Sequence, residues 1–447
     1  MRETGLSAPQ YYLRIPERLH GRPIASLCLA LVAAFAAYRA LHSFTLAMTG
    51  TSALPIGDVY VFYANDFFAY LDGHYSLRLL FAAHNEHPIL TARLTLFVDT
   101  IWFGASGKFG IVVSYFLVFV TSIMMAYLTA APNAWERIGL TLVFLGLGCS
   151  TIQLDNLSIP FQAEFFFVHA FALAALIALR RALEGRRWWY AVALACNFAA
   201  VFSLASGALL GGAFVAMAVW TRRIDRWFAM FFACHLLLIL LFVWMAVGPG
   251  GPADSASIAR RLAFFLAFVG NLLVLWPKWV LPAGAVIAAI CGGLFSWLTW
   301  RAVFRGVRYR DESVIAALAM FAILEAMAAS FTRAHLGVDY ALSLKYTTCT
   351  MLLLAALFAF VWRAVPQSPS RLAALLAVSA VLVIANSREF GDGWRERNRT
   401  MDAMFSEIRD GNIPPTAPAY LGTSRDNLAA VMTRFRELHL GPFRPTN

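Results

Sequence analysis

The chain has 447 residues, 60% of them hydrophobic and only 14% charged, whereas soluble domains hold roughly 45–50% apolar and about 25% charged residues. Soluble cores stop growing near about 250–300 residues. A chain of 49.4 kDa with a mean hydropathy of +0.66 therefore needs lipid around much of its surface. This excludes a single water-soluble globule, a coiled coil, a collagen-like chain and a disordered chain.

The charge balance is basic, with 36 Lys and Arg against 25 Asp and Glu and a net charge of +11. Nearly all the cations are arginines that cluster between apolar runs, which is the pattern of cytoplasmic loops facing anionic headgroups. We therefore expect membrane lipids as partners and no nucleic acid. The six cysteines lie in apolar stretches without a C-x-x-C pair, so they predict neither a disulfide framework nor a zinc site.

Segments that are apolar over about 20 residues predict membrane-spanning helices. Eleven such segments follow one another, at 24–48, 109–131, 137–153, 164–181, 188–205, 206–220, 226–248, 279–300, 313–332, 346–364 and 370–387. The pair 188–205 and 206–220 is broken only by Ser206-Gly207, so a helical hairpin with short arms is an alternative there. No cleavage site follows the first apolar run, so we expect that run to stay as an anchor.

One further apolar stretch, 262–276, is short and ends at Trp276-Pro277. If it crossed the membrane, the arginine cluster between Arg301 and Arg310 would face outward, against the rule that cation-rich short loops stay in the cytoplasm. We therefore predict a re-entrant or interfacial helix at 262–276. The expected fold class is an all-α polytopic transmembrane bundle of about eleven spans plus this helix, with a cytoplasmic N-terminus.

Two polar segments differ from the rest, the loop at 49–108 and the tail at 388–447. The same charge rule places both on the extracytoplasmic side. In the loop, apolar residues recur at helical spacing around Phe67 and Leu80, which indicates helices lying along the membrane interface.

Prolines around Pro414 divide the tail into expected helices at 395–409 and 424–438. A segment of about 60 residues is too small for a robust core of its own, so we expect the tail to pack on the first outer loop. The predicted organisation is a transmembrane domain at 1–387 and a small extracytoplasmic helical segment at 388–447.

The first outer loop gathers titratable side chains close to the expected lipid boundary, where ionisable groups are functional candidates by default. Asp58 and Asp66 both lie in its first part. A carboxylate at this height is able to take a proton from an acceptor hydroxyl during displacement at a sugar's anomeric carbon, which is the work of a general base. The alternative is that Asp58 or Asp66 only caps an interfacial helix.

The same loop contains His84-Asn85-Glu86-His87, three titratable groups within four residues. If the segment is helical, His84 and His87 share one face and are able to hold an oligosaccharide, a phosphate or a metal. The spacing is not the H-E-x-x-H of zinc proteases. Substrate positioning, a structural hydrogen-bond hub and metal ligation stay open as roles.

The other outer loops supply further candidates for substrate binding, namely Asp155, Gln162, Glu164, Arg333, His335, Lys345 and Tyr346. Lys345 is one of only three lysines, and it stands beside Tyr346 where a span begins. A cation at a helix N-terminus is suited to clamp a phosphate. The alternative is a lysine that snorkels beside an interfacial tyrosine.

Glu325 stands in the middle of an apolar span, where an ionised carboxylate is costly. We expect it to be hydrogen-bonded, with Asn197, Asn271 or His235 as partner. A structural role and a place on a proton or substrate pathway are both open.

At these residues the sequence resembles the GT-C superfamily of integral-membrane glycosyltransferases. Asp58-x-x-x-x-Tyr63-Ala64 followed by Leu71-x-Gly73-x-Tyr75 is similar to the first-loop pattern of bacterial polyprenol-phosphate-mannose-type transferases. The His84 to His87 segment resembles the HNEHR motif of a group of bacterial relatives, with Pro88 in place of the arginine. Ser343-Leu344-Lys345-Tyr346 is similar to the S-R-Y ahead of a late span in such proteins, with lysine for arginine.

The resemblance implies an inverting transferase at the outer face of the bacterial inner membrane, acting in cell-envelope synthesis such as that of lipopolysaccharide. It implies a polyprenyl-phosphate-linked sugar as donor and a lipid or glycan as acceptor. The base by position is Asp58, with Asp66 in reserve, and Tyr63 joins the substrate-binding candidates. A cation such as Lys345 or Arg333 would stabilise the leaving phosphate. Some members of the superfamily use a divalent cation, but we predict no cofactor and no metal here.

Two other functions compete with this prediction. A flippase or transporter of lipid-linked saccharides would share the spans, but it should carry several charged residues along a central path, and Glu325 is the main candidate for one. An O-antigen ligase or polymerase has related chemistry but usually keeps its large loop late in the chain, whereas here the large loop comes first.

Overall fold

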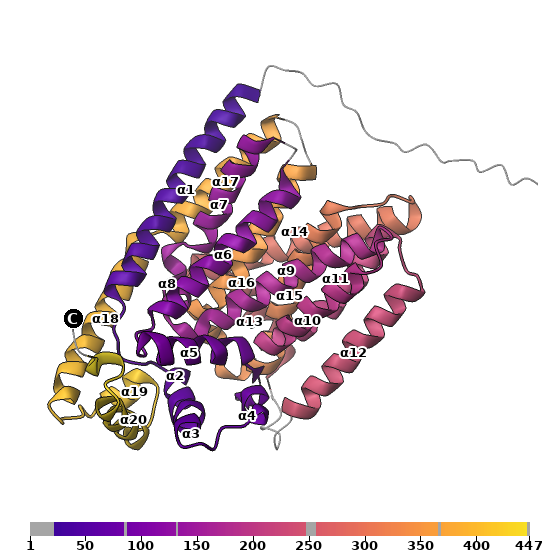
Figure 1. Ribbon diagram of the computed structural model, residues 1–447. Coiled ribbons are helices and arrows are strands. Elements are labelled where there is room, and N and C mark those ends of the chain that lie inside the picture. The colour runs from indigo at the N-terminus through magenta and orange to yellow at the C-terminus, as the bar shows by residue number, and fades with distance from the viewer. Residues whose placement is uncertain (1–21, 85–86, 131–132, 247–255, 365–367, 445–447) are drawn as a thin grey trace, which may run out of the picture.

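The computed structural model describes residues 22–84, 87–130, 133–246, 256–364 and 368–444. Its helices pack into one bundle, and the first loop and the tail lie together at one end of that bundle (Figure 1). We call this end the loop end.

Within the described residues, eight helices are long and apolar enough to cross a membrane. They are built on α1 (Arg22–Gly50), α6 (Lys108–Thr129), α9 (Ala163–Leu183), α12 (Arg226–Ala246), α14 (Pro277–Phe304), α15 (Asp311–Arg333), α16 (Thr347–Ala364) and α17 (Ser368–Ala385). A ninth span is formed if α7 (Ala134–Gly148) and the segment Thr151–Ser158, which meet at 47°, count as one broken helix. The chain is therefore a multi-pass helical membrane protein.

In the described part of the chain, eight or nine candidate spans stand where the sequence predicted about eleven. The difference lies mainly at 188–220, where the alternative of two short arms is the one observed. Here α10 (Trp189–Ser203) has 15 residues and α11 (Leu210–Thr221) has 12, with the 3-10 turn η5 (Ala205–Leu209) between them. At a rise of about 1.5 Å per residue, neither helix reaches the roughly 30 Å of a hydrocarbon core. Ser206-Gly207, the break that the sequence indicated, lies inside η5.

The stretch predicted as re-entrant or interfacial forms α13 (Ile258–Val269), a helix of 12 residues, and the short 3-10 turn η6 (Asn271–Leu273). It is too short to span, as expected. Its backbone lies directly on α14, since a Cβ at Gly284 would come within 1.9 Å of the Leu266 carbonyl oxygen. The broken helix pair identified above lies instead at 134–158.

Small residues allow similar close contact between α1 and α7. A Cβ added at Gly146 would lie 2.5 Å from the Cβ of Ala36, so this position admits only glycine without a shift of the helices. Close approach over small residues is the usual way in which membrane helices gain packing energy.

Ion pairs join the helices at the end opposite the loop end. Asp311, at the start of α15, contacts both Arg180 and Arg363, and Arg363 Nε lies 2.9 Å from Glu312 Oε1. Because α15 runs from this network to the loop end (Figure 1), its last residue, Arg333, is placed beside the first loop.

The first loop is folded into short elements. These are α2 (Asp58–Phe62), the π-helix η2 (Tyr63–Phe67), α3 (Phe68–Leu71), α4 (Leu77–Phe81), the two-residue strands β1 (Ala83–His84) and β2 (His87–Pro88), and α5 (Leu90–Phe103). The helices expected around Phe67 and Leu80 are present. The helical alternative for 84–87 is wrong, because His84 and His87 are directly paired across the antiparallel β1–β2 hairpin.

The tail forms α18 (Arg388–Arg409), α19 (Ala417–Leu421), α20 (Arg425–Glu437) and the turn η10 (Gly441–Phe443). The expected contact with the loop is present. Phe435 is fully buried with its ring centroid 4.6 Å from that of Tyr63, and the Gly57 amide donates to the Leu421 carbonyl at 2.7 Å. Loop and tail thus share one apolar core, separate from the main core of the bundle.

Candidate functional site

Asp58 and His84 form the centre of the candidate site. Asp58 begins α2 after Gly57, whose φ of +58° lies in the left-handed region that favours glycine. His84 Nε2 lies 3.1 Å from Asp58 Oδ1. His84 is buried and its ring meets Phe161 edge-on, whereas 47% of the Asp58 side chain is exposed. The histidine therefore holds an aspartate that is still accessible from outside.

Several positive or polarised groups act on the Asp58 carboxylate. The hydrogen bond from His84 lowers its pKa most, and the electrostatic influence of His84, Lys345 and His87 lowers it further, against an opposing effect of burial. The pKa of Asp58 consequently lies below its ordinary value. Asp58 is ionised at neutral pH, which is the form that a general base requires.

Arg333 brings the end of α15 to the first loop. Its Nη2 donates to His87 Nε2 at 3.2 Å, and its Nη1 donates to the Tyr346 hydroxyl at 3.4 Å. Since arginine has only donors, Nε2 of His87 must be the acceptor. Arg333 thus connects the β1–β2 hairpin to the segment that precedes α16.

Lys345 lies in that segment, in the turn η9 (Leu344–Tyr346). Its Nζ donates to the Tyr340 hydroxyl at 2.5 Å and stands 4.2 Å from the centroid of the Tyr340 ring. Burial raises the pKa of Tyr340, but the hydrogen bond from Lys345 and the charges of Lys345 and Arg333 outweigh it, so this pKa lies below its ordinary value. The shift reflects a strongly positive local field.

Two buried asparagines fix the backbone that carries Lys345. Asn156, in α8 (Leu154–Ser158), donates from Nδ2 to the carbonyl oxygens of Leu344 and Lys345 and to Thr348 Oγ1. Asn271 donates from Nδ2 to the Ala341 and Ser343 carbonyls. Polar side chains buried on both sides therefore hold the lysine's position.

Glu164 adds a second carboxylate at the start of α9. It is 5% exposed, and its Oε2 is buried without a hydrogen-bond partner among the described residues. Asp58, Arg333 and Lys345 all act on it electrostatically. We refer to Asp58, His84, His87, Glu164, Arg333 and Lys345 as the loop-end cluster.

The structure therefore brings together residues that the sequence placed in three separate segments. The loop-end cluster and its neighbour Tyr346 were all candidates from sequence. Sequence reasoning did not single out Tyr340, Asn156 or Asn271 as parts of the site. The only signal for the two asparagines was a polar residue at the edge of an apolar run.

Asp66, the reserve candidate for the base, has a different environment. It is 4% exposed, and its Oδ1 lies 3.1 Å from Arg93 Nε and accepts from the Tyr75 hydroxyl at 3.2 Å. Burial raises its pKa, although Arg93 and Tyr75 act in the opposite direction. Arg93 also donates to the Leu80 and Ala82 carbonyls. Asp66 therefore belongs to a buried ion pair that holds the loop together.

Two further candidates lie in the contact between loop and tail. The Tyr63 hydroxyl accepts from Thr100 Oγ1 at 3.5 Å, and its ring is buried against Phe435. Asp155 forms an ion pair with Arg397 of α18. Both side chains are engaged in packing the tail on the loop rather than in the loop-end cluster.

Four other candidates, Gln162, His335, Asn85 and Glu86, are not counted among the residues of the loop-end cluster. Gln162 ends the turn η4 (Pro160–Gln162), two residues before Glu164, and its Oε1 is buried without a hydrogen-bond partner among the described residues. His335 is exposed in η7 (Ala334–Leu336). Asn85 and Glu86 lie outside the described residues.

The prediction that Asn197, Asn271 or His235 is the partner of Glu325 is wrong. Its Oε2 lies 3.0 Å from Nε2 of His169, on α9. Asn197 is bonded instead to His235 Nδ1 at 3.0 Å, and Asn271 holds the backbone before Lys345 as described above. His169 and Glu325 lie on separate spans, and hydropathy carries no information on which spans are neighbours, so this pair was not predictable from the sequence.

Comparisons with known proteins identify no relative of this chain. No protein-family profile matches the chain, and searches among curated proteins and solved structures return no similar protein. The fold and hydropathy define a polytopic helical membrane protein. A more specific identification rests on the chemistry of the loop-end cluster.

Proposed function

We propose that this protein is a membrane glycosyltransferase that moves a sugar from a polyprenyl-phosphate donor to a lipid or glycan acceptor, at the extracytoplasmic face of the membrane. The observation that carries the proposal is the loop-end cluster. It combines a half-exposed, ionised Asp58 with two cations, Arg333 and Lys345, at the ends of spans. This is the pairing that displacement of a phosphate from a sugar requires.

In the proposed reaction, Asp58 takes the proton of the acceptor hydroxyl as its oxygen attacks the anomeric carbon. The bond between that carbon and the donor's phosphate oxygen breaks, and the polyprenyl phosphate leaves with the bonding electrons. Attack from the face opposite the leaving group inverts the anomeric centre. His84 orients Asp58 and keeps it ionised, so it is a positioning residue.

The leaving phosphate gains negative charge as the bond breaks. Lys345 and Arg333 are held by Tyr340, Tyr346 and His87, so they need little rearrangement to meet that charge. Pre-organised cations that act on developing charge stabilise the transition state more than mobile ones do. A lipid-linked donor also explains a site at the ends of membrane spans, since its tail stays in the bilayer while its sugar phosphate reaches the loop.

The test is an assay in membranes with a labelled polyprenyl-phosphate sugar. We expect Asp58→Asn to abolish transfer and Glu325→Gln to retain it. The lipid and glycan inventory of a deletion strain would then identify the sugar and the acceptor class. The proposal fails if Asp58→Asn transfers sugar at the rate of the unchanged protein.

A transporter of lipid-linked saccharides is the second candidate, and the buried His169–Glu325 pair favours it, because ionisable pairs inside spans are common on transport pathways. In that case Glu325→Gln would abolish translocation of a labelled lipid-linked saccharide in proteoliposomes, and Asp58→Asn would leave it intact. The two substitutions therefore give opposite results for the two functions.

A further inference from the structure

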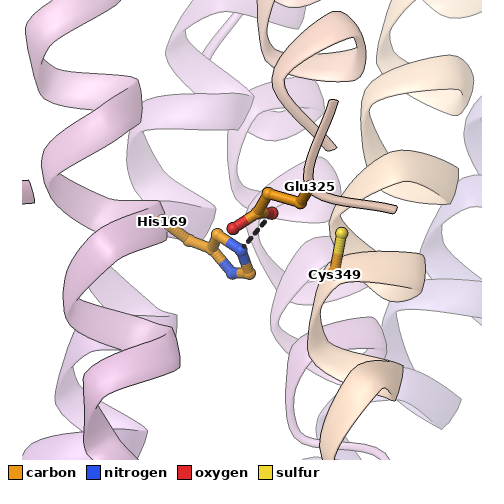
Figure 2. Close-up of side chains that lie close together, drawn as sticks. All are labelled: His169, Glu325 and Cys349. Carbon is orange, nitrogen blue, oxygen red and sulfur yellow. Dashed lines mark hydrogen bonds and ion pairs between the residues drawn. The ribbon is translucent and has the colours of Figure 1, made fainter. Parts of the chain in front are cut away.

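Three side chains from different spans meet inside the bundle, and none of them is a member of the loop-end cluster, although His169 follows Glu164 by five residues on α9 and Cys349 follows Lys345 by four. His169 comes from α9, Glu325 from α15 and Cys349 from α16, and Figure 2 shows them turned toward one another. One possible ligand atom from each lies within 4.8 Å of the others. Their exposed fractions are 4%, 7% and 5%, so all three are buried.

Their chemistry is that of a transition-metal site. Imidazole nitrogen, carboxylate oxygen and thiolate sulfur are the three ligand types that zinc takes from proteins. Calcium and magnesium prefer oxygen ligands alone. Among the described residues, these side chains make up the one group of three histidine, cysteine or acidic residues close enough to hold a metal ion.

Charge balance supports a divalent ion at this depth. An isolated charge in the bilayer interior is costly. A divalent cation bound by the Glu325 carboxylate, the Cys349 thiolate and a neutral His169 has no net charge, so the loaded site would carry little of that cost. A monovalent or a trivalent ion would leave one charge uncompensated.

A pocket borders the site at His169. It holds about 60 Å³ and is lined by His169, Gln153 and Thr348 together with mainly apolar side chains. Gln153 is 1% exposed, and its Oε1 has no hydrogen-bond partner among the described residues, although its Nε2 donates to the Leu147 and Gly148 carbonyls. The pocket that His169 lines therefore also holds a buried polar atom, Gln153 Oε1, without a partner among the described residues.

We propose that, in contrast to the expectation from the cysteine spacing, His169, Glu325 and Cys349 bind one zinc-class divalent ion within the membrane bundle. Three protein ligands leave a fourth coordination position open, as in zinc sites that take water or a small ligand. The proposal is independent of sugar transfer, because none of the three residues belongs to the loop-end cluster.

Binding has a defined proton balance. The Cys349 thiol gives up its proton to become a thiolate. That proton leaves to solvent as the ion binds, so the apparent affinity should rise with pH while the thiol is protonated.

The experiment uses the full chain purified in detergent with an affinity tag that contains no histidine. After dialysis against buffered Zn²⁺, elemental analysis should find about one zinc per chain. Cys349→Ser and Glu325→Gln should each weaken binding by at least about 100-fold, since even residues that only support metal ligands cost 10–100-fold when changed. Cys291→Ser is the matched control, because Cys291 is also buried but is not part of such a group.

Cobalt binding to the unchanged protein gives a spectroscopic readout that does not depend on whether a variant folds. Co²⁺ bound to the unchanged protein should show a near-ultraviolet sulfur-to-metal charge-transfer band, and so should Cys291→Ser. Absence of zinc from the dialysed protein, or a cobalt complex without the sulfur band, would overturn the proposal.

Asp58→Asn separates this proposal from the proposed function. It should abolish sugar transfer while leaving the zinc content and the cobalt band unchanged. If Asp58→Asn removes the metal, the ion is bound at the loop end and the buried site is refuted.

Discussion

His84 Nε2 lies 3.1 Å from Asp58 Oδ1 and joins the β1–β2 hairpin to the start of α2. The two residues are 26 positions apart in one loop, and the chain between them forms three further short helical elements. Because His84 is buried and Asp58 is half exposed, the contact fixes the carboxylate without covering it.

Asp58→Asn should reduce sugar transfer by about 10²–10⁴-fold, the usual contribution of a general base. Asp72→Asn is the matched control. Asp72 lies in the same loop and pairs with Arg434 at 2.9 Å, with about half of its side chain exposed, and such surface pairs contribute little. Initial rates of both variants in membranes check this, and an equal loss in the two would assign the effect to the fold of the loop.

His84→Gln should shift the acid side of the pH–rate profile upward. The pKa of Asp58 is held low first by the hydrogen bond from His84, while burial alone raises it. Without the imidazole this pKa rises, so the base is lost at a higher pH. The profile of kcat/KM against pH measures the shift, and His74→Gln, an exposed histidine of the same loop, should leave it in place.

The same contact has a consequence for stability. A carboxyl group whose pKa is lower in the folded state than in the unfolded chain stabilises the fold above the unfolded value of about 3.9. That contribution is lost as the pH falls through the folded pKa. Acid should therefore loosen the contact between α2 and β1, and hydrogen exchange near 58–62 measures it.

Lys345→Gln should lower kcat by about 10²–10³-fold, the effect of removing one pre-organised group from a site of developing negative charge. Lys345→Arg keeps the charge and should recover part of the rate. Lys108→Gln, an exposed lysine in the first turn of α6, is the control. Single-turnover rates separate this loss from a change in donor binding, and the prediction is contradicted if the arginine variant is as slow as the glutamine variant.

Phe435→Ala should detach the tail from the loop. Phe435 is fully buried against Tyr63, and truncation of a buried phenylalanine costs about 3–5 kcal/mol. Limited proteolysis should then cut the tail faster. In Leu438→Ala, at a position 40% exposed, the protease should cut the tail at the original rate. If the tail is cut equally fast in both variants, Phe435 does not hold the interface.

Arg93→Met should destabilise the first loop by about 3–5 kcal/mol, because it leaves the buried Asp66 without its partner. Burial already raises the pKa of Asp66, and loss of the guanidinium raises it further. Protonation then relieves the unpaired charge, so the destabilisation should be smaller at about pH 5 than at about pH 8. Adding Asp66→Asn should restore part of the stability, as thermal unfolding in detergent would show.

The sequence by itself determined the class of the protein. Its composition requires lipid, and apolar runs such as that of α6 need no distant partner to be identified as helices, since the bilayer selects for length and hydropathy. The tail helices and the helices of the first loop also follow from local periodicity and proline positions. Most members of the loop-end cluster were recognisable as charges near span ends.

Only the tertiary structure decided which of these residues meet. The hairpin at His84 depends on packing that hydropathy does not measure. The partner of Glu325 is His169, 156 positions away. Asp66 pairs with the buried guanidinium of Arg93, and for this reason Asp58 and not Asp66 is the proposed base. A local pattern shows that a buried charge needs a partner, but which partner it finds is set by how the helices pack.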